Sequence, residues 1–124
     1  MSNLSIAVGS DHAGLKLKNM VVQELTAMGH KVLDIGTDSE ESVDYPDYAF
    51  KVAQAVKEGK ADFGVLVCFT GIGMSIAANK VNGIRAALCC DTRRAELARR
   101  HNDANILCLG AGFIDNKQLP SILS

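Results

Sequence analysis

The sequence predicts an α/β fold, a three-layer αβα sandwich in which a five-stranded parallel, Rossmann-like sheet lies between two layers of helices. Two observations predict it. Five apolar runs rich in β-branched residues recur along the 124 residues, at 4–10, 31–36, 63–68, 84–90 and 105–110. Between them, apolar residues recur at helical spacing. Near-continuous apolarity indicates strands that are covered on both faces, and alternating strands and helices are typical of right-handed βαβ units.

The first helix is predicted between the first two strands. Leu17, Val21, Leu25 and Met28 recur on one helical face, and Gly29 follows where a helix often ends with a residue of positive φ. The chain therefore crosses over the sheet between these strands.

The second helix is predicted over residues 46–58, with Asp44 as its N-cap. Val52 and Val56 share one face, and Gly59 follows the helix. Further helices over 72–80 and 92–101 complete the alternation. The chain is expected to be a single domain spanning residues 1–124, without linker or repeat.

Composition excludes several classes of function. The chain is 48% hydrophobic and 22% charged, with a net charge of -1, two Tyr, four Phe and no Trp. The basic, aromatic-rich surface of a nucleic-acid-binding protein is therefore not expected. No stretch is long enough to span a membrane, and the N-terminus does not read as a signal peptide, so we expect a cytoplasmic protein.

The four cysteines lie in or beside apolar runs and form no CxxC motif. The spacing favours neither a disulfide framework nor a zinc site. We interpret Cys89, Cys90 and Cys108 as small core residues.

Candidate chemistry gathers after the predicted strands, where ligands bind in open parallel sheets. "GSDHAG" (9–14) follows the first strand, "CFTGIG" (68–73) ends the third, and Asp91 follows the fourth. The glycine turn is not a dinucleotide fingerprint, because Ile76 replaces the third glycine, and no GK[ST] marks a P-loop. What remains is a turn into a helix N-terminus, which presents free amides to an anion.

Cys68 stands directly before that turn. A helix N-terminus stabilises the thiolate form of a neighbouring cysteine, which can then act as a base facing a row of amide donors. This pairing suits proton abstraction α to a carbonyl, with the amides holding an enediolate oxygen. The alternative is a buried strand-end cysteine with a purely structural turn.

The histidines differ in their surroundings. Asp11 and His12 follow the first strand and are expected to share the sheet edge of Cys68. His30, in "MGHK", is interpreted as structural. For His101, at the end of the fourth helix beside Asn102, a functional role and a favourable charge at the helix dipole both remain open.

"GSDHAG", "DYPDYA", "CFTGIGMSIAANKVNGIRAAL" and "RRHNDANILCLG" together resemble the type B ribose-5-phosphate isomerase family, which includes the galactose-6-phosphate isomerase subunits. The resemblance implies aldose–ketose isomerisation of a pentose or hexose phosphate through an enediolate, most simply ribose 5-phosphate to ribulose 5-phosphate. It also implies no metal or organic cofactor, and a homodimer with shared active sites that can pair into a tetramer.

The resemblance also assigns roles. Cys68 would be the base, and the turn with the amide of residue 69 would form the anion hole. Asp11 and His12 would bind hydroxyls and assist ring opening, Tyr45 would wall the pocket, and His101 and Asn102 would come from the partner subunit. The implied catalytic residues are Cys68, Thr70, His101 and Asp11, and the implied substrate-binding residues are His12, Tyr45, Phe69, Gly71, Ile72, Gly73 and Asn102.

Three departures from the family pattern stand out. Phe69 replaces a glycine in the anion hole, where a positive φ would strain it, and its ring is expected in the pocket or at the subunit seam. Gly112 replaces a phosphate-binding arginine. The sequence ends at Ser124 and is expected to lack the family's longer C-terminal helix and tail, with two further arginines. Phosphate binding is expected to be weaker as a result.

These departures leave alternatives to a working sugar-phosphate isomerase. One is a noncatalytic subunit or sugar-binding module that retains Cys68. Another is an isomerase of unphosphorylated sugars, with Phe69 stacking on the sugar ring. An unrelated doubly wound phosphate or nucleotide binder is the last.

Overall fold

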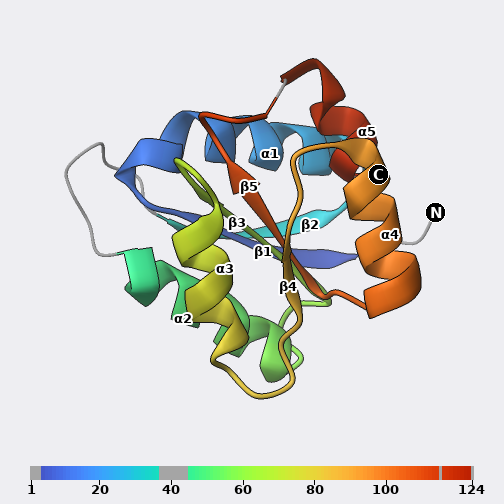
Figure 1. Cartoon of the computed structure of the whole chain (residues 1–124). Coiled ribbons are helices and arrows are strands. Elements are labelled where there is room, and N and C mark those ends of the chain that lie inside the picture. Colours follow the sequence, from blue (N-terminus) through green and yellow to red (C-terminus); the bar gives the residue numbers. More distant parts are fainter. Residues whose placement is uncertain (1–3, 37–44, 115, 124) are drawn as a thin grey trace.

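The computed structural model describes residues 4–36, 45–114 and 116–123, so the predicted N-cap Asp44 lies outside the described residues. Within them, five parallel strands form one sheet in the order β2-β1-β3-β5-β4. Helices cover both faces (Figure 1). The predicted three-layer fold is confirmed.

The strands lie where the apolar runs predicted them, with the fourth shorter than expected. Their bounds are β1 Ser5–Ser10, β2 Lys31–Gly36, β3 Phe63–Cys68, β4 Ala86–Leu88 and β5 Ile106–Gly110. β4 is an edge strand that pairs only with β5. The central strands β1, β3 and β5 carry most of the buried surface of the sheet.

Gly29 has the positive φ expected there, and Gly59 also has positive φ. The helices follow the prediction to within a few residues. They are α1 Leu15–Ala27, α2 Tyr45–Lys57, α3 Ile72–Asn79, α4 Thr92–Asn102 and a short α5 Leu119–Leu123, with 3-10 turns η1 His12–Gly14 and η2 Asn116–Gln118. One face of the sheet packs against α1 and α5, and the other against α2 and α3.

The two faces of the sheet build two separate hydrophobic clusters. Val8, Val21 and Leu109 are fully buried on the α1 side, whereas Val52 and Leu66 are fully buried on the α2 side. Because side chains alternate along a strand, each central strand supplies both clusters. Cys68 belongs to the cluster on the α2 and α3 side.

The order of the strands locates the switch point. From β1 the chain crosses to β2 on one side, and from β2 it returns past β1 to β3 on the other. The carboxyl ends of β1 and β3 are therefore adjacent, with Ser10 opposite Val67. Open α/β sheets bind ligands at such a point.

An ion pair between buried Lys18 of α1 and partly exposed Asp34 of β2 was not expected from the sequence. Lys18 has only 1% of its side chain exposed, and its Nζ lies 2.9 and 3.1 Å from the two carboxylate oxygens of Asp34 in β2. Asp34 also accepts a hydrogen bond from the amide of Gly36. Burying a lysine is costly unless it is paired, so this contact holds α1 to β2 beside the switch point.

Among the described residues, no helix is both long and apolar enough to cross a membrane.

The carboxyl end of β5 lies very close to the chain that follows β3. A Cβ added to Gly110 would lie 2.5 Å from the carbonyl oxygen of Thr70 and 2.7 Å from its carbonyl carbon. Both atoms belong to the backbone, so no rotamer change can relieve the contact. Glycine at this position therefore sets the distance between β5 and the turn after Cys68.

We predict that Gly110→Ala destabilises the fold by about 3 kcal/mol or more, because the backbone after β3 must shift. The matched comparison is Gly59→Ala. Gly59 has φ +77 but nothing within 4 Å of an added Cβ, so only the left-handed conformation opposes it, at about 1 to 2 kcal/mol. Urea unfolding measures both. If both variants lost the same free energy of unfolding, the close approach at Gly110 would be contradicted.

Candidate active site

Cys68 is the last residue of β3, and its thiol faces the turn that leads into α3. The backbone amide of Gly71 donates a hydrogen bond to Sγ over 3.1 Å in a buried environment. An amide pointing at sulfur stabilises negative charge there. The thiol near the switch point is therefore held by the first glycine of the turn.

The residues of the turn form the N-terminus of α3. Gly71 is the N-cap of α3 with φ 81, a conformation that glycine adopts without strain. The Thr70 hydroxyl accepts a hydrogen bond from the amide of Ile72 at 3.1 Å. Gly73 lies in the first helical turn, where amides have no intrahelical acceptor. The amide of Gly71, which was expected in the anion hole, and the amide of Ile72 are thus both engaged locally.

Phe69 does not adopt the strained backbone that its position raised as a concern. Among the described residues, Asp103 is the only one other than glycine with positive φ. The Phe69 ring is 56% exposed and lies against Gly112 and Phe113. These contacts lie in the chain that follows β5.

Asp11 lies beside this turn, as expected. Its amide donates to the carbonyl of Val67, the residue before Cys68, over 3.2 Å. Its carboxylate Oδ1 accepts from the amide of Gly14 at 3.0 Å and so caps η1. His12 follows within η1 and is partly buried. Both residues therefore share the carboxyl edge with Cys68.

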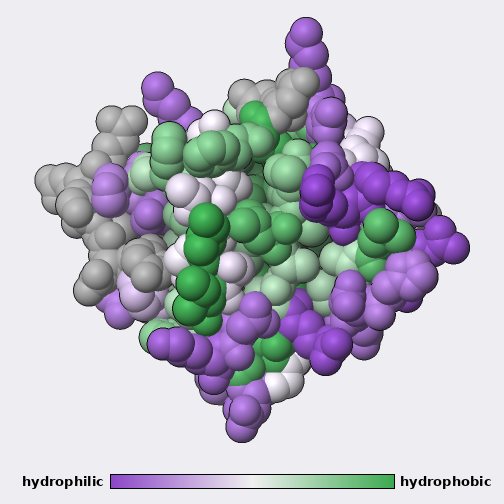
Figure 2. Space-filling model, in the orientation of Figure 1, coloured by the Kyte–Doolittle hydropathy of each residue, from purple (hydrophilic) through white to green (hydrophobic). Residues whose placement is uncertain are grey.

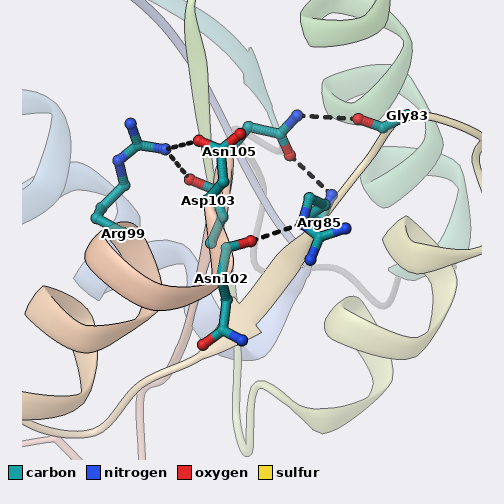
Figure 3. Close-up of polar contacts among 7 residues, drawn as sticks. Gly83, Arg85, Arg99, Asn102, Asp103 and Asn105 are labelled. Carbon is teal, nitrogen blue, oxygen red and sulfur yellow. Dashed lines mark hydrogen bonds and ion pairs between the residues drawn. The ribbon is translucent and has the colours of Figure 1, made fainter.

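His101 and Asn102 do not join them within one chain. They end α4, which runs back from the carboxyl edge of the sheet to the start of β5. In Figure 3 the Asn102 carbonyl accepts a hydrogen bond from Nε of Arg85, and the Asn102 side chain points away from that contact. The Asn105 side chain also bonds to this region. Its Oδ1 accepts a hydrogen bond from the Arg85 amide, and its Nδ2 donates one to the Gly83 carbonyl.

Tyr45 begins α2, and its side chain lies outside the part of the chain that the structure describes. Ile72, the first residue of α3, is 52% exposed. His30 has the structural role we expected, because its Nδ1 accepts the amide of Leu4 over 3.2 Å.

The interpretation of the other cysteines as core residues is wrong for Cys90. Cys89 and Cys108 are buried, but Cys90 is exposed, with Sγ 3.8 Å from a guanidinium nitrogen of Arg94. The reason is that β4 ends at Leu88, so the chain at Cys90 is already leaving the sheet to enter α4. Asp91 then caps α4 by accepting the Arg94 amide over 2.8 Å.

Among the described residues, no three His, Cys, Asp or Glu side chains are grouped so as to hold a metal ion.

Residues 6–124 match the sequence profile of the family described as Ribose/Galactose Isomerase. The chain belongs to this family. It is 51% identical to ribose-5-phosphate isomerase B of Escherichia coli over 109 residues, which are 88% of this chain and 73% of that protein. It is 50% identical over 112 residues to D-erythrulose-4-phosphate isomerase of Pectobacterium atrosepticum, covering 90% of this chain and 74% of that one.

Solved structures agree with the sequence comparison. Ribose-5-phosphate isomerase B of Clostridium thermocellum superimposes with a TM-score of 0.95 at 49% identity, covering 97% of this chain and 81% of that chain. The family catalyses aldose–ketose isomerisation of sugar phosphates, so the chain is an intramolecular oxidoreductase. An unrelated nucleotide binder is therefore excluded.

Two features near the site escaped sequence reasoning. The contact between Phe69 and Gly112 joins residues 43 positions apart in the sequence, 112 minus 69, and no local pattern indicates it. The pairing of buried Lys18 with Asp34 had a weak signal, because Lys18 lies three residues before Val21 and shares its buried face.

We predict that alkylation of the native protein with iodoacetamide labels Cys90 at least about tenfold faster than Cys108, because reactivity follows exposure and thiolate content. Burial raises the pKa of the Cys108 thiol far above its usual value, with the neighbouring Cys68 and Cys89 adding to the effect. Burial and the nearby Asp91 also raise the pKa of Cys89. Peptide mass mapping measures each rate, with urea-unfolded protein as control. Equal native rates at Cys90 and Cys108 would refute the burial described here.

Proposed function

We propose that the chain interconverts ribose 5-phosphate and ribulose 5-phosphate through an enediolate, with Cys68 as the base. The observation that supports this most directly is the hydrogen bond from the Gly71 amide to Sγ of Cys68 at 3.1 Å. In this contact a backbone amide points at the sulfur, near the switch point and beside the N-terminus of α3.

The proposed chemistry is a proton transfer that needs no external oxidant. The thiolate of Cys68 takes the proton from C2 of the open-chain aldose, and the electron pair of that C–H bond forms the C1–C2 double bond of an enediolate. Charge moves to the oxygen on C1, where amides of the turn stabilise it. The hydroxyl proton on O2 moves to O1, and the thiol returns its proton to C1, which leaves a ketone at C2.

Other residues would support this step. We assign Asp11 and His12, at the same edge, to sugar hydroxyls and ring opening, and Tyr45 to the pocket wall. Thr70 holds the turn through its contact with the Ile72 amide. Asp11 also caps η1, so its substitution by alanine would change both the local backbone and the proposed chemistry.

The pentose substrate is a proposal because relatives with different substrate names are equally similar. The relative named for ribose 5-phosphate is 51% identical, and the one named for D-erythrulose 4-phosphate is 50% identical. The family description itself includes galactose. Overall identity therefore does not select the length of the sugar.

We also propose a homodimer with shared active sites, which can pair into a tetramer. His101 and Asn102 lie at the amino edge of the sheet, opposite Cys68. Ile72 and Ile76 of α3 are both more than half exposed, and Leu88 is exposed beside them. Figure 2 shows apolar side chains gathered over α3 on this face. A second copy that covers α3 would bring its α4 terminus toward Cys68.

A cytoplasmic location is part of the proposal. The four cysteines are all free thiols, as is usual in a reducing compartment.

We predict that Cys68→Ala lowers kcat for ribose 5-phosphate by about 10²-fold to 10⁴-fold, because the base that moves the proton is lost. The matched control is Cys90→Ala, which removes an exposed thiol outside the proposed site. Coupled turnover assays measure activity, and circular dichroism checks the fold. Undiminished turnover by a folded Cys68→Ala protein would remove Cys68 from the mechanism.

Shared sites predict complementation between two inactive variants. Cys68→Ala and His101→Ala would each be nearly inactive alone. Coexpressed, they would form mixed dimers in which one of the two sites is intact, so purified mixed dimers would show about half of the wild-type activity. Tags on the two variants allow the mixed dimers to be purified and assayed. Mixed dimers without recovered activity would show that His101 does not act across the interface.

A further inference from the structure

The ring of Phe69 fills the space that a side chain at residue 112 would need. A Cβ added to Gly112 would lie 2.5 Å from both Cε1 and Cζ of Phe69, and 3.1 Å from Cδ1. Such distances are too short for any real Cβ, so the ring rests directly on the Gly112 backbone. Phe69 and Gly112 are therefore one structural unit.

Phe113 supports the ring from a second side. The two ring centroids are 5.7 Å apart with an interplanar angle of 69°, the edge-to-face arrangement that aromatic pairs prefer. Both rings remain largely exposed, Phe69 at 56% and Phe113 at 65%. They contribute little to the core, because most of their surface stays outside it. We call Phe69, Gly112 and Phe113 the aromatic wall.

Backbone hydrogen bonds fix the aromatic wall relative to Cys68. The amide of Ala111 donates to the carbonyl of Cys68 at 2.8 Å, and the amide of Gly112 donates to the carbonyl of Phe69 at 3.0 Å. The amide of Phe113 closes a turn onto Gly110 at 3.0 Å. The wall thus begins one residue from the proposed catalytic sulfur and cannot move independently of it.

We propose that the aromatic wall limits the length of the sugar phosphate that the site accepts, with Phe69 as the specificity-determining residue and Gly112 as its positioning residue. This rests on the proposed function. An aromatic ring packs favourably against the C–H groups of a sugar chain, whereas its negative face repels a phosphate. In this proposal the wall therefore borders the carbon chain of the substrate.

A ring of this size at the residue after the proposed base would reduce the room for additional carbons. Removing or displacing it should admit a longer chain and weaken contacts with a short one. Gly112→Ala is a mild way to displace it, because Gly112 has no positive φ and is exposed. The atom that must move is the far end of an exposed side chain, so the fold is expected to survive.

The test compares D-erythrose 4-phosphate, D-ribose 5-phosphate and D-allose 6-phosphate as substrates of the purified full chain. In both Phe69→Ala and Gly112→Ala, we expect the ratio of kcat/KM for the six-carbon sugar to that for the five-carbon sugar to rise about fivefold or more. For ribose 5-phosphate we expect KM to rise by a larger factor than kcat falls. Gly59→Ala, remote from the wall and open on all sides, is the control and leaves the ratio unchanged.

The double variant tests whether Gly112 acts on the kcat/KM ratio through the Phe69 ring or independently of it. Without the Phe69 ring, an alanine at residue 112 has nothing to displace, so Phe69→Ala/Gly112→Ala should match Phe69→Ala alone. If Gly112→Ala changed the kcat/KM ratio equally in the wild-type protein and in Phe69→Ala, its positioning role would be overturned.

A uniform loss on all sugars, accompanied by a change in oligomeric state, would identify the rings as an interface and overturn the specificity proposal. An unchanged ratio with normal turnover would also overturn it, while leaving the proposed function standing. Failure of the wild-type chain to isomerise all three sugars would instead overturn the proposed function, and the aromatic wall with it.

Discussion

The site depends on how closely the carboxyl ends of β3 and β5 approach each other. Gly110 lies so near the Thr70 carbonyl that no side chain fits between them. Beyond this point the two chains remain hydrogen-bonded, from Ala111 to Cys68 and from Gly112 to Phe69. The turn into α3 therefore has one position relative to the sheet, and the Gly71 amide is directed at the Cys68 sulfur as a result.

This constraint links residues that would otherwise appear to be separate departures from the family. A phenylalanine after the thiol and a glycine at residue 112 are each unusual for the resemblance described above. In three dimensions they are complementary, since the ring of one occupies the side-chain volume that the other leaves empty. The backbone at Phe69 is not in the left-handed region, so the substitution is accommodated by packing and involves no strain in the turn.

The candidate site residues lie at two opposite edges of the sheet. Asp11, His12 and Cys68 share the carboxyl edge because the strand order places β1 beside β3. His101 and Asn102 lie at the opposite edge, where Arg85 and Asn105 hold the end of α4 (Figure 3). The proposed shared site between two copies would reconcile this separation with the roles that the family resemblance assigns. The exposed apolar side chains of α3, which begins at the Cys68 turn, offer a surface for that contact.

The sequence by itself determined the elements and the edge at which the chemistry lies. Apolar runs and helical spacing depend on local periodicity, so β2 and β3 were predicted to the residue, and Gly29 after α1 has the expected positive φ. The parallel order of elements was enough to place Asp11 and Cys68 together. The exposure of Cys90 was missed because the apolar pattern continues past the point where β4 ends.

Only the tertiary structure decided which distant residues touch. Three features depend on strand order and on close packing between segments. They are the pairing of Lys18 with Asp34, the contact of Phe69 with Gly112 and the separation of His101 from Cys68. No periodicity in the sequence encodes such contacts, because each forms between elements whose relative position is set by the whole sheet.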